Sequence, residues 1–312
     1  MGAFSSKGVH FNPDKDIPSL EGRVILVTGG NSGLGKQSIL ELAKHNPAEI
    51  WLGARNNSKA QEAIDDIKHQ VPKAPPIKIL QMDLTSFESI SEAAKTFRQE
   101  SQRLDLLLLN AGILAVPEGT TKDGYEIQFG TNHMGHALLS KLLLPTLLKT
   151  AEQPGSDVRV VVLSSEAHQY APRAQGIMFN TLKTKAPEIS STTRYGQSKL
   201  ANILFAQEFA RRYPQLKVPV VHPGLVRTNL ANTMSENSIL MRIAWKVLAS
   251  VIGVDLYTGA LNQLWASTSP NVKSGEYYEP VGVTGRGNRH TNDPKLAEKL
   301  WSWTEKELEN EV

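Results

Sequence analysis

Apolar residues in this chain fall into short β-branched runs that alternate with stretches of helical spacing. RVILVTG at 23–29 is a short run rich in β-branched residues and bounded by glycine, which is typical of a strand buried on both faces. LGKQSILELAKH at 34–45 places its apolar residues three and four apart, as one buried helix face requires. The same two patterns predict further strands at 49–54, 77–84, 104–112, 157–165 and 217–224, and further helices at 58–70, 86–100, 124–149 and 194–213.

The alternation of strand and helix predicts the fold class. One strand-helix unit follows another roughly every 20 to 30 residues, which implies parallel strands with helices on both faces of the sheet. We therefore predict an α/β fold, a single-domain Rossmann-type doubly wound parallel sheet. No linker-like boundary or tandem repeat divides the chain, so we predict one domain at 21–312 after an N-terminal extension at 1–20.

Two segments interrupt this rhythm, a long polar loop at 166–190 and a partly apolar segment at 225–256. Both follow carboxyl ends of predicted strands, where open α/β sheets bind ligands. The apolar stretch at 239–254 is too short to cross a bilayer, which needs about 20 apolar residues. We interpret 225–256 as a substrate lid, with or without peripheral membrane contact; a packing helix at the domain edge is the alternative.

The composition excludes several classes of protein. Of the 312 residues, 40% are hydrophobic and 21% are charged, which is ordinary for a globular chain with a buried core. The net charge of +3 comes from interspersed charges, so no basic stripe predicts nucleic-acid binding. Cysteine is absent, and no spacing of His, Asp and Glu indicates a metal site. The N-terminus lacks the apolar stretch of a signal peptide, so we expect a cytoplasmic protein.

VTGGNSGLGK at 27–36 joins the first predicted strand to the first predicted helix. Glycines let the backbone approach a pyrophosphate closely, and amides at the start of the helix then face the negative charge. Glycine clusters also occur in ordinary tight turns, but the flanking strand and helix favour a nucleotide loop. The residues we expect against the cofactor are Gly29, Asn31, Ser32, Gly33, Leu34 and Gly35.

The second predicted strand ends in LGARNN, where a carboxylate would be expected if the adenine ribose carried free hydroxyl groups. The guanidinium of Arg55 can instead meet a 2′-phosphate through a bidentate fork, which favours NADP(H) over NAD(H). A surface arginine at the strand end is the alternative. At the end of the third predicted strand, Asp83 is expected to accept from the adenine amino group, with Leu84 beside it. Asp83 fits an acid that precedes a helix equally well.

In YGQSK, Tyr195 and Lys199 stand four positions apart and so share one helix face. A neighbouring ammonium favours the phenolate and is expected to lower the pKa of Tyr195 from about 10 toward the working pH. The tyrosine would then be a usable proton donor and acceptor, with Ser165 bonding the same substrate oxygen. An ordinary surface pair is the alternative, and the glycine loop upstream favours the catalytic interpretation.

Several motifs in one order resemble the short-chain dehydrogenase/reductase family, over most of the chain. They are TGGNSGLG at 28–35, NAG at 110–112, the asparagine of TNHMGH, YGQSK at 195–199 and PGLVRT at 223–228. Finer details resemble the retinol dehydrogenase-like and WW-domain-oxidoreductase-like branch, among them NHMGHALL, SSEAH and GEYYEPVG.

The resemblance implies a role for each matching position. Tyr195 is the general acid in reduction and the general base in oxidation, while Lys199 lowers its pKa and holds the nicotinamide ribose. Ser165, preferred to Ser164 as the second serine of its motif, orients the carbonyl oxygen. Asn132 holds a water in the proton relay and bends its helix. The remaining implied cofactor contacts are Asn110, Ala111, Gly112, Pro223, Gly224, Val226 and Thr228.

One feature departs from the simplest members of the family: thirty positions separate Ser165 from Tyr195, because a loop is inserted. The contacts of this loop with substrate therefore do not follow from the resemblance. His168 and His222 have no acidic partner at motif spacing, and we interpret both as structural or pocket-lining residues.

We therefore expect an NADPH-dependent oxidoreductase that transfers hydride between the nicotinamide and a carbonyl or alcohol. The apolar lid favours a lipophilic small-molecule substrate, polycyclic or retinoid-like, and the protein is expected to be a monomer or a homodimer. One alternative is a catalytically silent dinucleotide-binding regulatory protein. A serine hydrolase is another, which the lack of a GxSxG motif around Ser164 and Ser165 disfavours.

Overall fold

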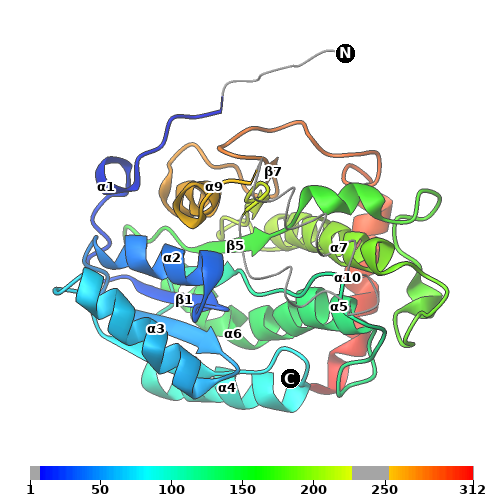
Figure 1. The fold of residues 1–312 in the computed structure, drawn as a ribbon, viewed down its shortest axis with the longest axis horizontal. Helices are drawn as coiled ribbons and strands as arrows, with labels where there is room; N and C mark the ends of the chain where they lie inside the picture. Colours follow the sequence, from blue (N-terminus) through cyan, green and yellow to red (C-terminus); the bar gives the residue numbers. More distant parts are fainter. Residues whose placement is uncertain (1–7, 227–252, 312) are drawn as a thin grey trace.

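The computed structural model describes residues 8–226 and 253–311, and in these ranges the strands form one sheet (Figure 1). The strands are β1 (Val24–Thr28), β2 (Glu49–Ala54), β3 (Ile77–Gln81), β4 (Leu106–Leu109), β5 (Arg159–Leu163), β6 (Val220–Val221) and β7 (Tyr277–Tyr278). Their order is β3-β2-β1-β4-β5-β6-β7, and every neighbouring pair is parallel. The predicted parallel sheet is confirmed.

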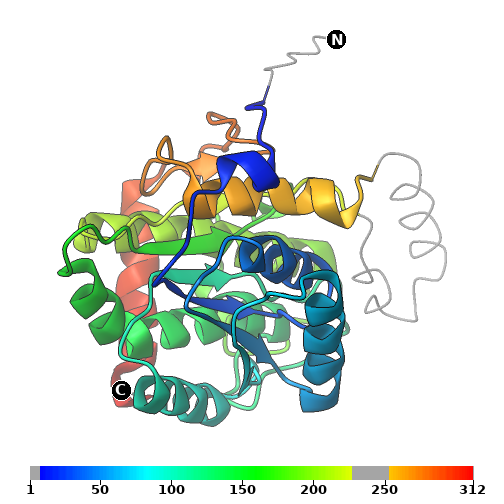
Figure 2. The same cartoon turned by 90° about the vertical axis from the view of Figure 1, so that its left-hand side faces the viewer.

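Helices cover both faces of the sheet (Figure 2). Their bounds are α1 (Pro13–Asp16), α2 (Gly33–Ala43), α3 (Asn57–Gln70), α4 (Phe87–Glu100), α5 (Ile127–Phe129), η1 (Gly130–Met134), α6 (Gly135–Ala151), η2 (Glu166–Tyr170), η3 (Phe179–Thr181), α7 (Ser191–Arg212), α9 (Leu256–Thr268), α10 (Pro294–Glu307) and η6 (Glu309–Glu311). One hydrophobic core combines side chains of α4, α6, α7 and α10 with one face of the sheet. A second core combines α2, α3 and α9 with the other face.

Strand β1 shows why the central strands are unbroken apolar runs. All five of its residues are buried. Successive side chains of a strand point to opposite faces. Leu26 accordingly joins the first core, while Ile25 and Val27 join the second. A strand covered on both sides has no position that faces water, so the alternation of a half-exposed strand is missing.

The helix predicted at 124–149 is divided into α5, η1 and α6 instead of being continuous. Within η1 the turn is wide, because the amide of Gly135 bonds the carbonyl of Gly130, five residues back rather than four. The polar segment 166–190 is also more ordered than predicted, since it contains η2 and η3. Strand β7 and helix α10 were not predicted.

The predicted N-terminal extension and the predicted lid differ in how much of each the structure describes. The described part of the extension lies on the domain, with Phe11, Ile17 and Leu20 buried in the second core. Most of the predicted lid, 227–252, lies outside the described residues.

Among the residues that are described, no helix combines the length and the hydropathy needed to cross a membrane. In the same ranges, no three His, Asp or Glu side chains are grouped to hold a metal ion.

Candidate active site

The predicted site residues gather where the order of the strands reverses. β1 and β4 are neighbours at the centre of the sheet, although β2 and β3 come between them in the chain. Crevices outside the carboxyl ends of strands at such a reversal bind ligands in open α/β sheets. The loops after β1, β4 and β5 all begin at this edge, and α7 packs against β5.

The loop between β1 and α2 leaves room that only glycine provides. Gly29 has a positive φ of 68°. A Cβ at Gly35 would lie 2.4 Å from the carbonyl oxygen of Gly29, so no side chain fits there. Helix α2 begins at Gly33, and the side chain of its N-cap residue, Ser32, makes no capping hydrogen bond. The first amides of α2 therefore stand uncapped beside a close-packed backbone, which fits the phosphates of a dinucleotide.

Arg55 lies at the end of β2 beside this loop. The amides of Gly29 and Gly30 both donate to the carbonyl of Gly53, over 2.8 and 3.2 Å, which ties the glycine loop to β2. Two residues further on, the exposed Arg55 makes no hydrogen bond or ion pair with any described residue. A free guanidinium next to a loop that fits phosphates also fits a 2′-phosphate.

Asp83 is held by its own turn. Its Oδ1 accepts from the amide of Thr85 over 3.0 Å and from the hydroxyl of Thr85 over 2.8 Å. This contact supports the local capping alternative at least as well as an adenine contact. Leu84 is buried, and its carbonyl would lie 2.7 Å from a Cβ at Gly135, so the start of α6 packs directly on it.

The loop after β4 is bonded to the end of β1. The amides of Asn110 and Ala111 both donate to the hydroxyl oxygen of Thr28, over 2.9 and 3.0 Å. The side-chain amide of Asn110 donates to the carbonyl of Thr28 over 2.8 Å. In the structure, therefore, Asn110 supports the loop rather than reaching outward, while the exposed Gly112 is left at the mouth of the crevice.

Asn132 is completely buried within the wide turn η1. Its Oδ1 accepts from the amide of Ile113 over 2.8 Å, and its Nδ2 donates to the carbonyl of Ile113 over 3.0 Å and to Ser198 Oγ over 2.9 Å. A Cβ at Gly112 would lie 3.1 Å from Asn132 Oδ1 and 3.4 Å from Lys199 Nζ. Asn132 and Lys199 therefore meet against the backbone of Gly112.

The two serines after β5 point in different directions. Ser164 is buried and donates its hydroxyl to the carbonyl of Lys199 over 2.8 Å, so it is used inside the fold. Ser165 is partly exposed, and its interaction with the phenol of Tyr195 acts to lower the pKa of that phenol. This arrangement supports the preference for Ser165 over Ser164.

The electrostatics of Tyr195 and Lys199 differ from the prediction. Lys199 Nζ lies 5.7 Å from the centre of the Tyr195 ring. Loss of hydration nevertheless raises the pKa of Tyr195 to about 12, opposed only by the bond to Ser165, although the side chain is partly exposed. Burial lowers the pKa of Lys199 to about 8. The predicted lowering of the Tyr195 pKa is therefore wrong for this structure, because desolvation dominates and raises this pKa instead.

Two residues inside the YGQSK motif were missed by the sequence analysis. The hydroxyl of Ser198 accepts from Asn132 and donates to the carbonyl of Tyr195 over 2.8 Å, so it joins two predicted catalytic residues. A Cβ at Gly196 would lie 2.6 Å from the carbonyl of Ala167, so η2 rests on α7 at this glycine. Both residues stand between Tyr195 and Lys199, but only the contacts of neighbouring segments reveal what they do.

His168 and His222 are placed as structural or pocket-lining residues. His168 is fully buried, and its Nδ1 donates to the carbonyl of Ser165 over 2.8 Å, so it holds the backbone of that serine. His222 is partly exposed, and its carbonyl accepts from Asn262 over 2.8 Å. Burial lowers the pKa of His168 below its usual value and that of His222 to about 4.

The predicted cofactor segment after β6, 223–228, is described only as far as Val226. Pro223, Gly224 and Val226 keep accessible surface, and Gly224 has a positive φ of 84°. Val226 forms an isolated bridge with Val254. Thr228, the predicted nicotinamide contact, lies outside the described residues.

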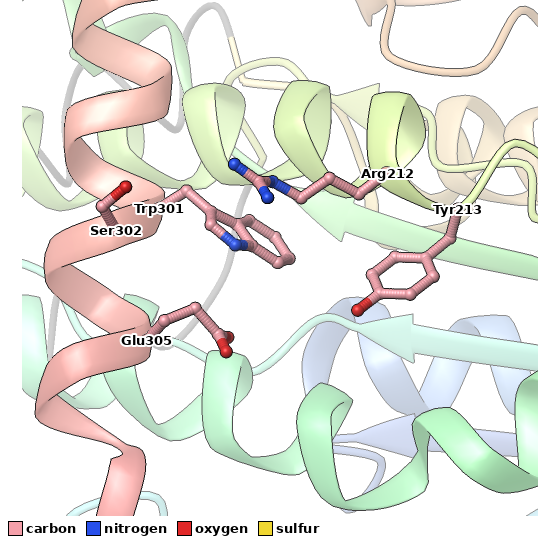
Figure 3. Close-up of a pocket in the computed structure, with 5 residues that line it drawn as sticks. All are labelled: Arg212, Tyr213, Trp301, Ser302 and Glu305. Atoms are coloured by element: carbon pink, nitrogen blue, oxygen red, sulfur yellow. The ribbon is translucent and has the colours of Figure 1, made fainter.

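The pocket drawn in Figure 3 lies away from the candidate active site. It is lined by Arg212, Tyr213, Trp301, Ser302 and Glu305. These residues belong to the C-terminal end of α7 and to α10, whereas Tyr195 stands near the N-terminal end of α7. The pocket therefore has no part in the candidate site.

Comparison with known proteins places the chain among oxidoreductases. The sequence profile described as short chain dehydrogenase matches residues 23–239. An uncharacterized oxidoreductase of Schizosaccharomyces pombe is 37% identical over 95% of this chain and 87% of its own length. Retinol dehydrogenase 14 of Homo sapiens is 33% identical over 92% of this chain and 86% of its own length. A crystal structure from Mycobacterium paratuberculosis superposes with a TM-score of 0.74 at 29% identity, covering 96% of this chain and 98% of that one.

Proposed function

The chain belongs to the short-chain dehydrogenase/reductase family, in its retinol dehydrogenase-like branch, and we propose that within it the protein is an NADP-dependent carbonyl reductase. The observation that carries the proposal is the meeting of Asn132, Lys199 and Gly112 at the strand reversal, with Tyr195 and Ser165 interacting beside them. Proton-transfer groups thus converge on the crevice where the family binds its nicotinamide cofactor.

In this proposal the residues of the chain orient the carbonyl and move one proton. When bound, the nicotinamide supplies the hydride that reaches the carbonyl carbon. Ser165 and Tyr195 donate hydrogen bonds to the carbonyl oxygen, and Tyr195 gives its proton to that oxygen as negative charge develops there. Lys199 stabilises the phenolate that remains, because its ammonium is near the ring.

The pKa shifts favour the reductive direction. With a pKa of about 12, Tyr195 is protonated at neutral pH and ready to donate. Lys199, with a pKa of about 8, still carries its charge there. Oxidation would need Tyr195 as the deprotonated phenolate to accept a proton, so we expect the rate of oxidation to rise with pH.

Arg55 supports NADP(H) as the cofactor. It is the cation at the end of β2, and its guanidinium is free among the described residues. A bidentate, charge-assisted contact with the 2′-phosphate would be lost with NAD(H). We expect Arg55→Gln to raise the KM for NADPH about 10- to 100-fold and to change the KM for NADH little.

The substrate we propose is lipophilic. The apolar character of 225–256 supports this choice, and the retinol in the name of one relative is itself a lipophilic alcohol. Peripheral membrane contact and a monomeric or homodimeric state remain predictions.

The test is a screen of ketones, aldehydes and quinones with NADPH and with NADH, followed at the nicotinamide absorbance. We expect turnover of bulky apolar carbonyls with NADPH. NADPH binding without turnover across the panel would instead favour the alternative, a catalytically silent regulatory protein. Turnover only with NADH would overturn the cofactor proposed from Arg55.

A further inference from the structure

A buried histidine that the mechanism above does not use joins the two halves of the candidate site. His136 is 3% exposed and stands one helical turn after Asn132, at the start of α6. Its Nδ1 lies 3.1 Å from the carbonyl oxygen of Asn132, and its Nε2 lies 3.0 Å from the hydroxyl of Thr28. One imidazole thus spans the end of β1 and the wide turn.

The hydrogen-bond partners fix the direction of both contacts. The carbonyl of Asn132 can only accept, so Nδ1 of His136 carries a hydrogen. The hydroxyl oxygen of Thr28 already accepts from the amides of Asn110 and Ala111. Its own hydrogen must therefore point away, either to Nε2 of His136 at 3.0 Å or to a carbonyl at 3.5 Å, and the shorter contact is the better one.

Only the neutral imidazole with its hydrogen on Nδ1 satisfies both neighbours. A hydrogen on Nε2 would face the oxygen of Thr28, which has no lone pair left for it. Burial acts in the same direction and lowers the pKa of His136 to about 4, with the charge of Lys199 contributing. The histidine is therefore a fixed, uncharged link at neutral pH.

We propose that His136 is a positioning residue, which holds the cofactor loop after β4 and the backbone of Asn132 in one fixed arrangement. This inference rests on the proposed function, because it assigns the Thr28 side to cofactor binding and the Asn132 side to turnover. Through Thr28 the imidazole sets the amides of Asn110 and Ala111. Through the carbonyl of Asn132 it sets the turn whose side chain meets Lys199 at Gly112.

Two substitutions separate the two hydrogen bonds. His136→Asn keeps a donor near the Nδ1 position and removes the acceptor that faces Thr28. His136→Gln keeps an acceptor near the Nε2 position and removes the donor that faces Asn132. We expect His136→Asn to raise the Kd for NADPH about 10-fold, and His136→Gln to lower kcat about 10-fold with an unchanged Kd, the effect of one buried hydrogen bond in each case.

His133 provides a matched control. It is as buried as His136 and lies in the same helical stretch, but its Nε2 contacts Thr304 Oγ1 at 3.1 Å and its ring packs against Phe129 and Phe205, away from the cofactor loop. His133→Asn and His133→Gln should lower the Tm without separating Kd from kcat. If the His136 variants behave as the His133 variants do at equal loss of Tm, the positioning role is refuted.

The experiment combines these variants with a measurement that needs no substitution and no turnover. Kd is taken from fluorescence titration with NADPH, kcat from reduction of phenanthrenequinone, and the tautomer from ¹⁵N NMR of the imidazoles in the wild-type protein. We expect His136 to keep its hydrogen on Nδ1 at every pH from 6 to 8, a window set by the usual histidine pKa of about 6.5. A hydrogen on Nε2, or titration of His136 between pH 6 and 8, would refute the inference even if no carbonyl is turned over. Failure of the quinone assay alone would count against the proposed function instead.

Discussion

The N-terminal half and the C-terminal end of α7 carry cations under opposite conditions. In the N-terminal half, Lys199 is 4% exposed, has no carboxylate partner among the described residues and has a pKa lowered to about 8. At its end, the side chains of Arg211 and Arg212 are 60% and 32% exposed and share the carboxylate of Glu208. A buried charge without a counter-charge is unfavourable for folding, whereas a paired surface charge is nearly neutral. The unfavourable one lies where the proposed chemistry needs it.

The largest expected effect is on kcat, when the phenol beside Lys199 is removed. Tyr195→Phe removes the proton donor and leaves the ring, so we expect kcat to fall about 1000-fold while NADPH still binds. Stopped-flow reduction of a carbonyl, together with a fluorescence titration, measures both quantities. Unchanged turnover would remove the mechanism.

Arg194, in the same half of α7, is a buried cation that has a counter-charge. Its Nη1 lies 3.0 Å from Glu126 Oε1, and the side chains are 3% and 1% exposed. Glu126→Gln leaves the guanidinium buried without its counter-charge, so we expect the free energy of unfolding to fall by about 3 kcal/mol. Urea unfolding measures this change.

The double variant Glu126→Gln, Arg194→Met is the matched control, since it removes both charges. It should recover part of the lost stability. If the single variant is as stable as the wild type, the pair contributes nothing and the contrast with Lys199 fails.

Lys199→Met tests the opposite case, a charge whose removal should stabilise the fold. The folded pKa of about 8 lies below the unfolded value of 10.5, so at neutral pH the wild type buries a charged amine. The unfolded state binds the extra proton between these two pKa values, and wild-type stability therefore rises with pH across that window. We expect the variant to be more stable than the wild type by up to about 3 kcal/mol at neutral pH, less what the lost hydrogen bond to Leu163 contributes.

The same variant should have almost no reductase activity. Chemical unfolding at several pH values checks the stability, and the advantage over the wild type should shrink as the pH rises from 8 toward 10.5. An advantage that stays constant with pH would show that packing, and not the charge, separates the two proteins.

The contrast along α7 also shows which features of the fold and of the candidate site can be predicted from sequence. The parallel sheet followed from apolar runs, which are local patterns, and motif spacing likewise names the candidate site residues, whose roles stay predictions. The pairing of Arg194 with Glu126 joins residues 68 positions apart, and no local pattern marks it. The direction of the pKa shift of Tyr195 was predicted wrongly, since spacing shows a neighbouring charge but not the desolvation of the phenol. The wide turn at Asn132 likewise depends on bonds to the distant Ile113.

The smallest effect is expected at the far end of α7, where the guanidinium of Arg212 stacks 5.0 Å from the Trp301 ring centre. Arg212→Gln leaves Glu208 paired with Arg211, so the carboxylate keeps a partner. An exposed ion pair and an exposed cation–π contact each contribute little, and we expect a loss of about 1 kcal/mol or less with unchanged kcat. Urea unfolding and the carbonyl assay check both quantities. A loss above about 2 kcal/mol, comparable to that of a buried pair, would show that exposure does not separate the two ends of the helix.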